Sequence, residues 1–267
     1  MTRINLGFAA WLLLCLTGAS RAGEGGSISG QVTWEGEAPK PVMLDITSKP
    51  EDLKVCACVP GEAAKASPRL AVDSATKGVA FTVVTLEGVP EEKAKPFPER
   101  EVVMDQKCCE FHPHVVWVEA GKTLLLKNSD NTLHNVHAKS SEGAAFNVSM
   151  PEKDQVLKRK LKDAGVLSLV CDAGHPWMSA YIFVVENPYI AITDAQGRFM
   201  IDGIPPGKYT LHYWHEGWEV TPILDLKTQK PSAYRYSDPL TRSVPVEVKG
   251  GAPTVAGAML SVAGFKK

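Results

Sequence analysis

After residue 22 the sequence has no run of the roughly 20 apolar residues that a membrane-spanning helix needs. It has no long block of lysine and arginine either, which argues against nucleic acid as a partner. No stretch combines an apolar period of about 3.6 residues with helix caps, and no internal repeat or low-complexity tract is present. These absences argue against a membrane-spanning protein and a helical bundle, and they favour a fold made of β-strands.

The N-terminal segment has the features of a secretory signal peptide. Arg3 opens a short basic region, Leu6–Leu16 is an apolar core, and Ser20–Ala22 is a small-x-Ala cleavage site. We therefore expect cleavage after Ala22 and a periplasmic or otherwise extracytoplasmic location. Removing this segment takes away two of the 29 basic residues and leaves 27 against 30 acidic ones, a net charge of −3.

Short strands separated by turns are predicted along the rest of the chain, and its length of about 245 residues suits one large or two ordinary β-domains. Proline-rich or charged segments at Val89–Arg100 and Glu186–Pro188 mark the domain boundaries. Trp218–Leu240 is predicted to be a loop. The expected division is a signal peptide at 1–22, strands of a flanking sandwich at 23–98, a central domain at 99–186 and a C-terminal β-domain at 187–267.

The cysteine count is odd once the signal peptide is removed, because six cysteines minus Cys15 leave five. An oxidising compartment favours disulfides, so one thiol needs another role, and Cys171 is the natural candidate. The other four form two close pairs, Cys56 with Cys58 and Cys108 with Cys109. Vicinal cysteines bond each other only with strain, so we expect a bridge between the two pairs and favour Cys58–Cys109. Metal binding by these four cysteines stays an alternative.

The most informative stretch is Leu169–Tyr181, LVCDAGHPWMSAY, where a Cys, a His and a Met follow one another as an apolar strand ends. A further histidine, His134, lies upstream in NSDNTLHNVH. Two imidazoles, a thiolate and a thioether are the ligands of a mononuclear copper electron-transfer site. In such a site Cys171 supplies the thiolate, His134 and His175 supply neutral ring nitrogens, and Met178 supplies a weak axial sulfur. We therefore predict one copper ion per chain.

These residues resemble the cupredoxins of the plastocyanin and azurin type. The likeness runs from about Glu99 to Glu186, a third of the chain, and includes EAGKTLLLKN at Glu119–Asn128 before the His134 strand. It implies a Greek-key β-sandwich that transfers electrons and is not an enzyme. It also implies that Asn135 braces the ligands through hydrogen bonds.

The ligand loop departs from the usual spacing of that family. Its Cys-x3-His-x2-Met pattern is more similar to the second half of the binuclear copper site of cytochrome oxidase, but Leu167 stands where that site needs another cysteine. One copper ion is therefore expected. The resemblance also implies a redox partner protein that docks on a hydrophobic patch near His175, Pro176 and Trp177, with a buried Trp177 as the alternative.

Thr193–Leu211, TDAQGRFMIDGIPPGKYTL, resembles carboxypeptidase regulatory-like domains of transthyretin-like fold. Their first strand is similar to Gly30–Val32, which lies far upstream. We therefore expect a discontinuous sandwich with the cupredoxin domain inserted in it, or else three consecutive units. The combination resembles exported bacterial methylamine-utilisation-like cupredoxin proteins, and for the second domain it implies a scaffold or sugar-binding role.

Two other functions stay open at this point. One is a copper carrier or storage protein, and the other is a structural or carbohydrate-binding β-module with a vestigial copper site. A multicopper oxidase or nitrite reductase needs further histidine-rich sites, and the seven scattered histidines do not visibly provide them.

Overall fold

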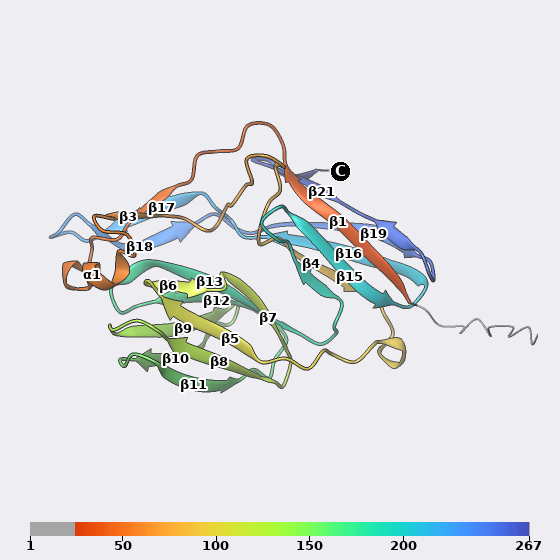
Figure 1. The fold of residues 1–267 in the computed structure, drawn as a ribbon, viewed down its shortest axis with the longest axis horizontal. Helices are drawn as coiled ribbons and strands as arrows, with labels where there is room; N and C mark the ends of the chain where they lie inside the picture. Colours follow the sequence, from red (N-terminus) through yellow and green to blue (C-terminus); the bar gives the residue numbers. More distant parts are fainter. Residues whose placement is uncertain (1–24, 267) are drawn as a thin grey trace, which may run out of the picture.

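The computed structural model describes residues 25–266, and its regular secondary structure consists almost wholly of β-strands (Figure 1). The all-β prediction is therefore confirmed. Most of the strands build two β-sandwiches, each with its own buried apolar core. No helix within 25–266 has both the length and the apolar character needed to cross a membrane. The predicted signal peptide at 1–22 lies outside the described residues.

The first sandwich is built from nine consecutive strands in two sheets. One sheet has the strand order β10-β9-β12-β13-β7, and the other has the order β11-β8-β5-β6. The strands are β5 (Val102–Lys107), β6 (Glu110–His112), β7 (Val115–Glu119), β8 (Thr123–Asn128), β9 (His134–Ser140), β10 (Gly143–Met150), β11 (Gln155–Lys160), β12 (Gly165–Cys171) and β13 (His175–Val185). Apolar residues alternate along these strands, so Leu124 and Leu126 of β8 and Leu169 of β12 point into one fully buried core.

The second sandwich takes its strands from both sides of the first in the sequence. Its sheets have the orders β15-β1-β21-β22, with β20 also on β1, and β14-β4-β16-β19. The strands are β1 (Gly26–Trp34), β4 (Val83–Glu87), β14 (Ile190–Ile192), β15 (Arg198–Ile204), β16 (Gly207–His215), β19 (Leu240–Val248), β20 (Pro253–Val255), β21 (Ala258–Ser261) and β22 (Gly264–Lys266). Because β1 and β4 pair with β15 and β16, strands β5–β13 lie within this sandwich in the chain order.

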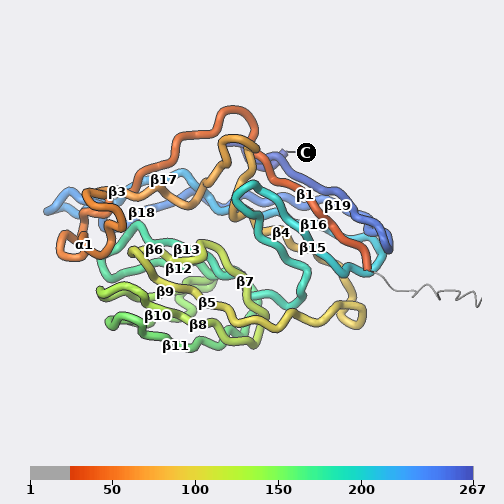
Figure 2. Tube along the Cα trace, in the orientation of Figure 1, coloured from red at the N-terminus to blue at the C-terminus, as the bar shows by residue number. Residues whose placement is uncertain are grey.

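Two long excursions leave the second sandwich and reach the first (Figure 2). The chain between β1 and β4 carries β2 (Met43–Asp45), η1 (Pro50–Asp52), α1 (Leu53–Cys56) and β3 (Ala64–Ala66), and the second excursion carries β17 (Val220–Leu224) and β18 (Pro231–Tyr236). A short 3-10 turn, η2 (Glu91–Lys93), precedes the first sandwich. The prediction of a loop at Trp218–Leu240 is wrong, since β17 and β18 form a hairpin there. Its residues are mostly exposed and include Pro222, so no alternation of burial marks the strands in the sequence.

Two disulfides tie the first excursion to the turn between β5 and β6. They join Cys56 to Cys109 and Cys58 to Cys108, with Cα atoms 4.9 and 5.7 Å apart. The expected bridging between the two pairs is present, but the favoured Cys58–Cys109 pairing is wrong. The physical reason is burial: Cys56 at the end of α1 and Cys109 are both fully buried, whereas Cys58 is exposed and faces the half-buried Cys108.

A buried ion-pair network joins the two sandwiches. Glu216, directly after β16, is only 1% exposed, and its carboxylate lies 3.0 Å from Nη1 of Arg69. The other carboxylate oxygen contacts Nε2 of His114, whose Nδ1 lies 3.0 Å from the carbonyl oxygen of Ser179 in β13. Buried charges are tolerated only when they are paired, so this contact specifies how the two sandwiches meet.

Candidate metal centre

The sheet order of the first sandwich brings three predicted ligands together. His134 is the first residue of β9, Cys171 is the last of β12, and His175 is the first of β13. These strands are neighbours, in the order β9-β12-β13, so the three side chains meet at one end of the sheet. The β12–β13 ladder shifts register between Val170 and Cys171, which lets the ligand loop turn over the sheet end.

The three donor atoms form a compact buried triangle. Cys171 Sγ lies 3.6 Å from His175 Nδ1 and 3.9 Å from His134 Nδ1, and the two Nδ1 atoms are 3.1 Å apart. Cys171 is 4% exposed and both histidines are 0% exposed. An ion bound at about 2.0–2.3 Å from each donor, at the centre of a trigonal set, would hold the donors roughly 3.5–3.9 Å apart. The two edges from Cys171 Sγ match this spacing, whereas the two Nδ1 atoms, 3.1 Å apart, would have to separate by about 0.4 Å to hold one small soft metal ion.

Each histidine is oriented by a carboxylate on its far side. His134 Nε2 lies 2.9 Å from Asp130 Oδ2, and His175 Nε2 lies 3.0 Å from Asp52 Oδ2. In this arrangement each Nε2–H donates to a carboxylate, which leaves the Nδ1 lone pair free for a metal. Neither aspartate was predicted from the sequence. Asp130 precedes His134 by four residues, but Asp52 is 123 residues from His175 and has no local signal.

The environment of His175 favours its neutral form. Burial, together with the nearby His134 and Lys49, lowers the pKa of His175 to about 4, although Asp52 acts in the opposite direction. Burial raises the pKa of the Cys171 thiol. A metal ion that binds here would therefore displace a proton from Cys171 but none from His175 at neutral pH.

Asp130 stays ionised although it is buried. Burial alone would raise the pKa of Asp130, but hydrogen bonds from His134 and from the backbone of Cys109 and Cys108 lower it overall. Its oxygens lie 2.8 Å from the Cys108 nitrogen and 2.7 Å from the Cys109 nitrogen. One carboxylate therefore holds both a candidate ligand and the turn that carries two disulfide cysteines.

Asn135 links two strands of the site through its side chain. Its Oδ1 accepts hydrogen bonds from the backbone nitrogens of Asp172 and Ala173 at 2.5 and 3.2 Å. Its Nδ2 donates to Oδ1 of Asn147 at 2.7 Å. The amide therefore ties the start of the ligand loop to β9 and β10.

Met178 and Trp177 are both buried in the same apolar core as Cys171. Met178 is 1% exposed and borders a cavity of about 310 Å³. The Trp177 ring meets the His175 ring edge-on at 5.2 Å, and its Nε1 donates to the carbonyl oxygen of Cys109 at 2.9 Å. The expectation of an exposed patch is therefore wrong for His175, and the alternative of a buried Trp177 is confirmed. Of the three residues only Pro176 is partly exposed.

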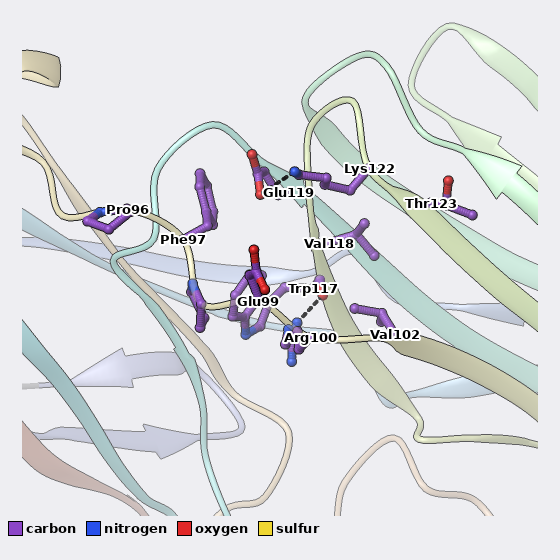
Figure 3. Close-up of a pocket in the computed structure, with 11 residues that line it drawn as sticks. Pro96, Phe97, Glu99, Arg100, Val102, Trp117, Val118, Glu119, Lys122 and Thr123 are labelled. Atoms are coloured by element: carbon purple, nitrogen blue, oxygen red, sulfur yellow. Dashed lines mark hydrogen bonds and ion pairs between the residues drawn. The ribbon is translucent and has the colours of Figure 1, made fainter.

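Two cavities of similar size differ in their relation to these ligands. One of about 550 Å³ reaches Cys171, and Arg69, Tyr181 and Tyr236 also line it. The other, of about 570 Å³, lies between the 96–102 linker and the turn after β7, and Figure 3 shows Arg100 beside Trp117 there. The Arg100 guanidinium lies 3.5 Å from the centre of the Trp117 ring. No candidate ligand lines this second cavity.

Comparisons with known proteins give only partial structural similarity. No family model matches the sequence, and no curated protein matches it. A purple cupredoxin from Nitrosopumilus maritimus is 17% identical and covers 32% of this chain and 100% of its own, with a TM-score of 0.29. Amicyanin from Paracoccus versutus is 25% identical and covers 38% of this chain and 97% of its own, also with a TM-score of 0.29. A copper-containing nitrite reductase from Thermus scotoductus SA-01 is 20% identical, with 35% of this chain and 24% of that chain covered and a TM-score of 0.29.

Proposed function

We propose that this protein is an exported mononuclear copper protein that transfers electrons. The observation that carries the proposal is the buried triangle of His134 Nδ1, His175 Nδ1 and Cys171 Sγ, with edges of 3.1–3.9 Å. Copper in such a site supplies reversible one-electron chemistry, and one ion per chain is proposed. Met178 is proposed as the weak axial ligand because it is buried three residues beyond His175 in β13.

The surrounding residues suit this role because they keep the donors in one arrangement. Three adjacent strands carry the ligands, and Asp52 and Asp130 hold the two rings by their far nitrogens. Asn135 holds the ligand loop. Buried apolar residues of the first core surround Cys171 on its inner side. A site that moves little between its oxidation states has a low barrier to electron transfer, so this rigidity supports transfer over catalysis, and we propose that the protein is not an enzyme.

The proposal also covers the division of the chain into domains and its location. We propose that 99–186 is a cupredoxin-like domain inserted in a transthyretin-like sandwich formed by 23–98 and 187–267, which acts as a scaffold. The pairing of β4 with both β14 and β16 supports this division. The two disulfides support an extracytoplasmic location, since such bonds persist in oxidising compartments.

A redox partner protein is proposed to approach the ligand loop from its exposed side. Asp172 and Gly174 are exposed and Pro176 is partly exposed, whereas His175 beneath them is buried. Electrons would then leave through the loop backbone or Cys171, and not through an open histidine edge.

The test is to load the purified protein with Cu(II) and record its optical and paramagnetic spectra. One copper per chain and an intense thiolate-to-copper band are expected, and Cys171→Ser should abolish the band. His112→Ala removes an exposed histidine with a side chain 53% exposed and should leave the band unchanged. Absence of the band in the parent protein would refute the proposal.

A copper carrier is the second candidate, and the complete burial of both histidines favours it because such a site holds an ion tightly. Voltammetry distinguishes the two functions. A carrier would bind Cu(I) without a reversible couple, whereas the electron-transfer protein shows one.

A further inference from the structure

The segment Ser48–Cys58, which we call the strap, covers the metal centre at His175. It includes η1 and α1 and lies at the end of the first sandwich, near β6 (Figure 1). Asp52 in the strap binds His175 Nε2 at 3.0 Å and accepts a hydrogen bond from Thr132 Oγ1 at 2.7 Å. The strap is therefore hydrogen-bonded both to the candidate ligand His175 and to Thr132, just before β9.

Close packing seals the strap against the ligand loop. Lys49 lies so near Gly174 that a Cβ atom there would be 2.9 Å from Lys49 Cδ, and Gly174 has a φ of +93° that favours glycine. Ser48 Oγ also lies 3.5 Å from the Gly174 carbonyl oxygen. These contacts explain why His175 is 0% exposed although it is the first residue of β13, at the end of a sheet.

The two disulfides that hold the strap differ in accessibility. The inner bond, Cys56–Cys109, is fully buried, and its sulfurs lie within 4.8 Å of a His175 ring nitrogen. The outer bond, Cys58–Cys108, has one exposed and one half-buried cysteine. A thiol reductant can therefore reach the outer bond first, and only afterwards the inner one.

The two segments that the disulfides join, the strap and the turn between β5 and β6, are held in place differently. Asp130 binds the Cys108 and Cys109 nitrogens, so that turn stays in place without the disulfides. On the other side, α1 has only four residues, which is too short to be stable alone. The apolar strap residues Leu53, Val55 and Ala57 pack against the first core but are only partly buried. We therefore expect the strap, and Asp52 with it, to be the part that moves if the disulfides break.

We propose that the strap is a disulfide-locked lid over the metal centre, and that Asp52 is a positioning residue for His175. A dithiol opens it: each S–S bond breaks and accepts two electrons and two protons, and the dithiol becomes a cyclic disulfide. Opening frees His175, whereas His134 keeps its Asp130 partner. The lid would also control metal exchange. This consequence rests on the proposed function, whereas the motion of the strap does not depend on it.

The motion is tested in the metal-free protein by carbethoxylation of histidines with diethyl pyrocarbonate, read peptide by peptide in a mass spectrometer. The reaction of His175 should be at least tenfold faster in the variant C56S/C58S/C108S/C109S, and also in the parent protein treated with dithiothreitol. The exposed His112 serves as the internal reference, and His134 should stay slow. An unchanged His175 rate, or an equal rise at His134, would overturn the lid.

Three single-residue variants distinguish a strap that moves from a chain that fails to fold. Asp52→Asn should speed the reaction of His175 several-fold, and Asp52→Glu should restore part of the protection. Glu51→Gln, at the exposed neighbouring carboxylate, should change nothing. Equal rates for Asp52→Asn and Glu51→Gln would show that Asp52 does not position His175.

Metal exchange is measured in the copper-loaded protein as the rate at which EDTA removes Cu(II). Asp52→Asn should release copper at least tenfold faster and shift the thiolate-to-copper band, which a purely structural role would leave in place. If Asp52→Asn changes neither the rate of copper release nor the thiolate-to-copper band, the proposal that the lid controls metal exchange is overturned. If the parent protein binds no copper, the proposed function is refuted. The carbethoxylation rates still show whether the strap acts as a lid over His175.

Discussion

The substitution Asp130→Asn tests whether one buried carboxylate holds the candidate metal centre together. Asp130 accepts from Cys108 through Oδ1 and from Cys109 and His134 through Oδ2. Asparagine can place its oxygen at the Oδ2 position, but its NH2 group then faces the Cys108 N–H. One hydrogen bond is lost and two become weaker because the acceptor is no longer charged.

The size of the effect follows from these contacts. A hydrogen bond to a charged group contributes about 1.5–3 kcal/mol, so losing one and weakening two should lower the free energy of unfolding by about 2–4 kcal/mol. The assay is urea unfolding of the metal-free protein with linear extrapolation. Asp163→Asn, at an exposed carboxylate, is the matched control and should change stability by less than about 0.5 kcal/mol.

The stability that Asp130 contributes should depend on pH in a predictable direction. Hydrogen bonds lower the pKa of Asp130 below its ordinary value of 3.8, despite the opposing effect of burial. The carboxylate therefore stabilises the fold above that ordinary value, and the contribution is lost as the pH falls through the folded pKa. The stability gap between parent and Asp130→Asn should be full at pH 5 and above and should narrow below about 3.8. A loss under about 1 kcal/mol at neutral pH would refute the reasoning.

Two further predictions concern other buried groups. Glu216→Gln leaves the buried Arg69 guanidinium without a charged partner, so unfolding by urea should show a loss of about 3–5 kcal/mol, whereas the exposed Glu219→Gln should be near neutral. His175 has a pKa of about 4, so its ring should stay neutral at pH 5 in an NMR titration of the metal-free protein. Because the unfolded chain binds that proton near pH 6.5, His175 should make stability fall as the pH drops from about 6.5 to 4, and an NMR pKa above 6 would contradict this.

The parts of the site that were predictable are those with short spacing. Cys171 and His175 flank one short loop, and the apolar pattern predicts the strands that adjoin it, so these two candidate donors could be expected from local sequence alone. His134 was predictable because a polar loop leads into its strand. The all-β class followed from the same alternation, as in β8 and β12.

The parts that were missed depend on contacts between distant segments. Four cysteines allow three pairings, and only the burial of Cys56 and Cys109 selects the observed one. The hairpin of β17 and β18 has mostly exposed residues, so its strands leave no periodic signal. In both cases the deciding information is three-dimensional position, which residue type does not encode.

The strap explains why His175 is buried although the resemblance implied an exposed docking patch there. The sequence pattern of the ligand loop, with Pro176 and Trp177 beside the histidine, is that of a site open at its histidine edge. Asp52 and Lys49 come from a segment more than 120 residues away and close that edge. If the site transfers electrons as proposed, the covered histidine leaves the loop backbone or Cys171 as the route, unless the histidine is first uncovered. On that proposal, the state of the two disulfides would decide which surface a partner protein can use.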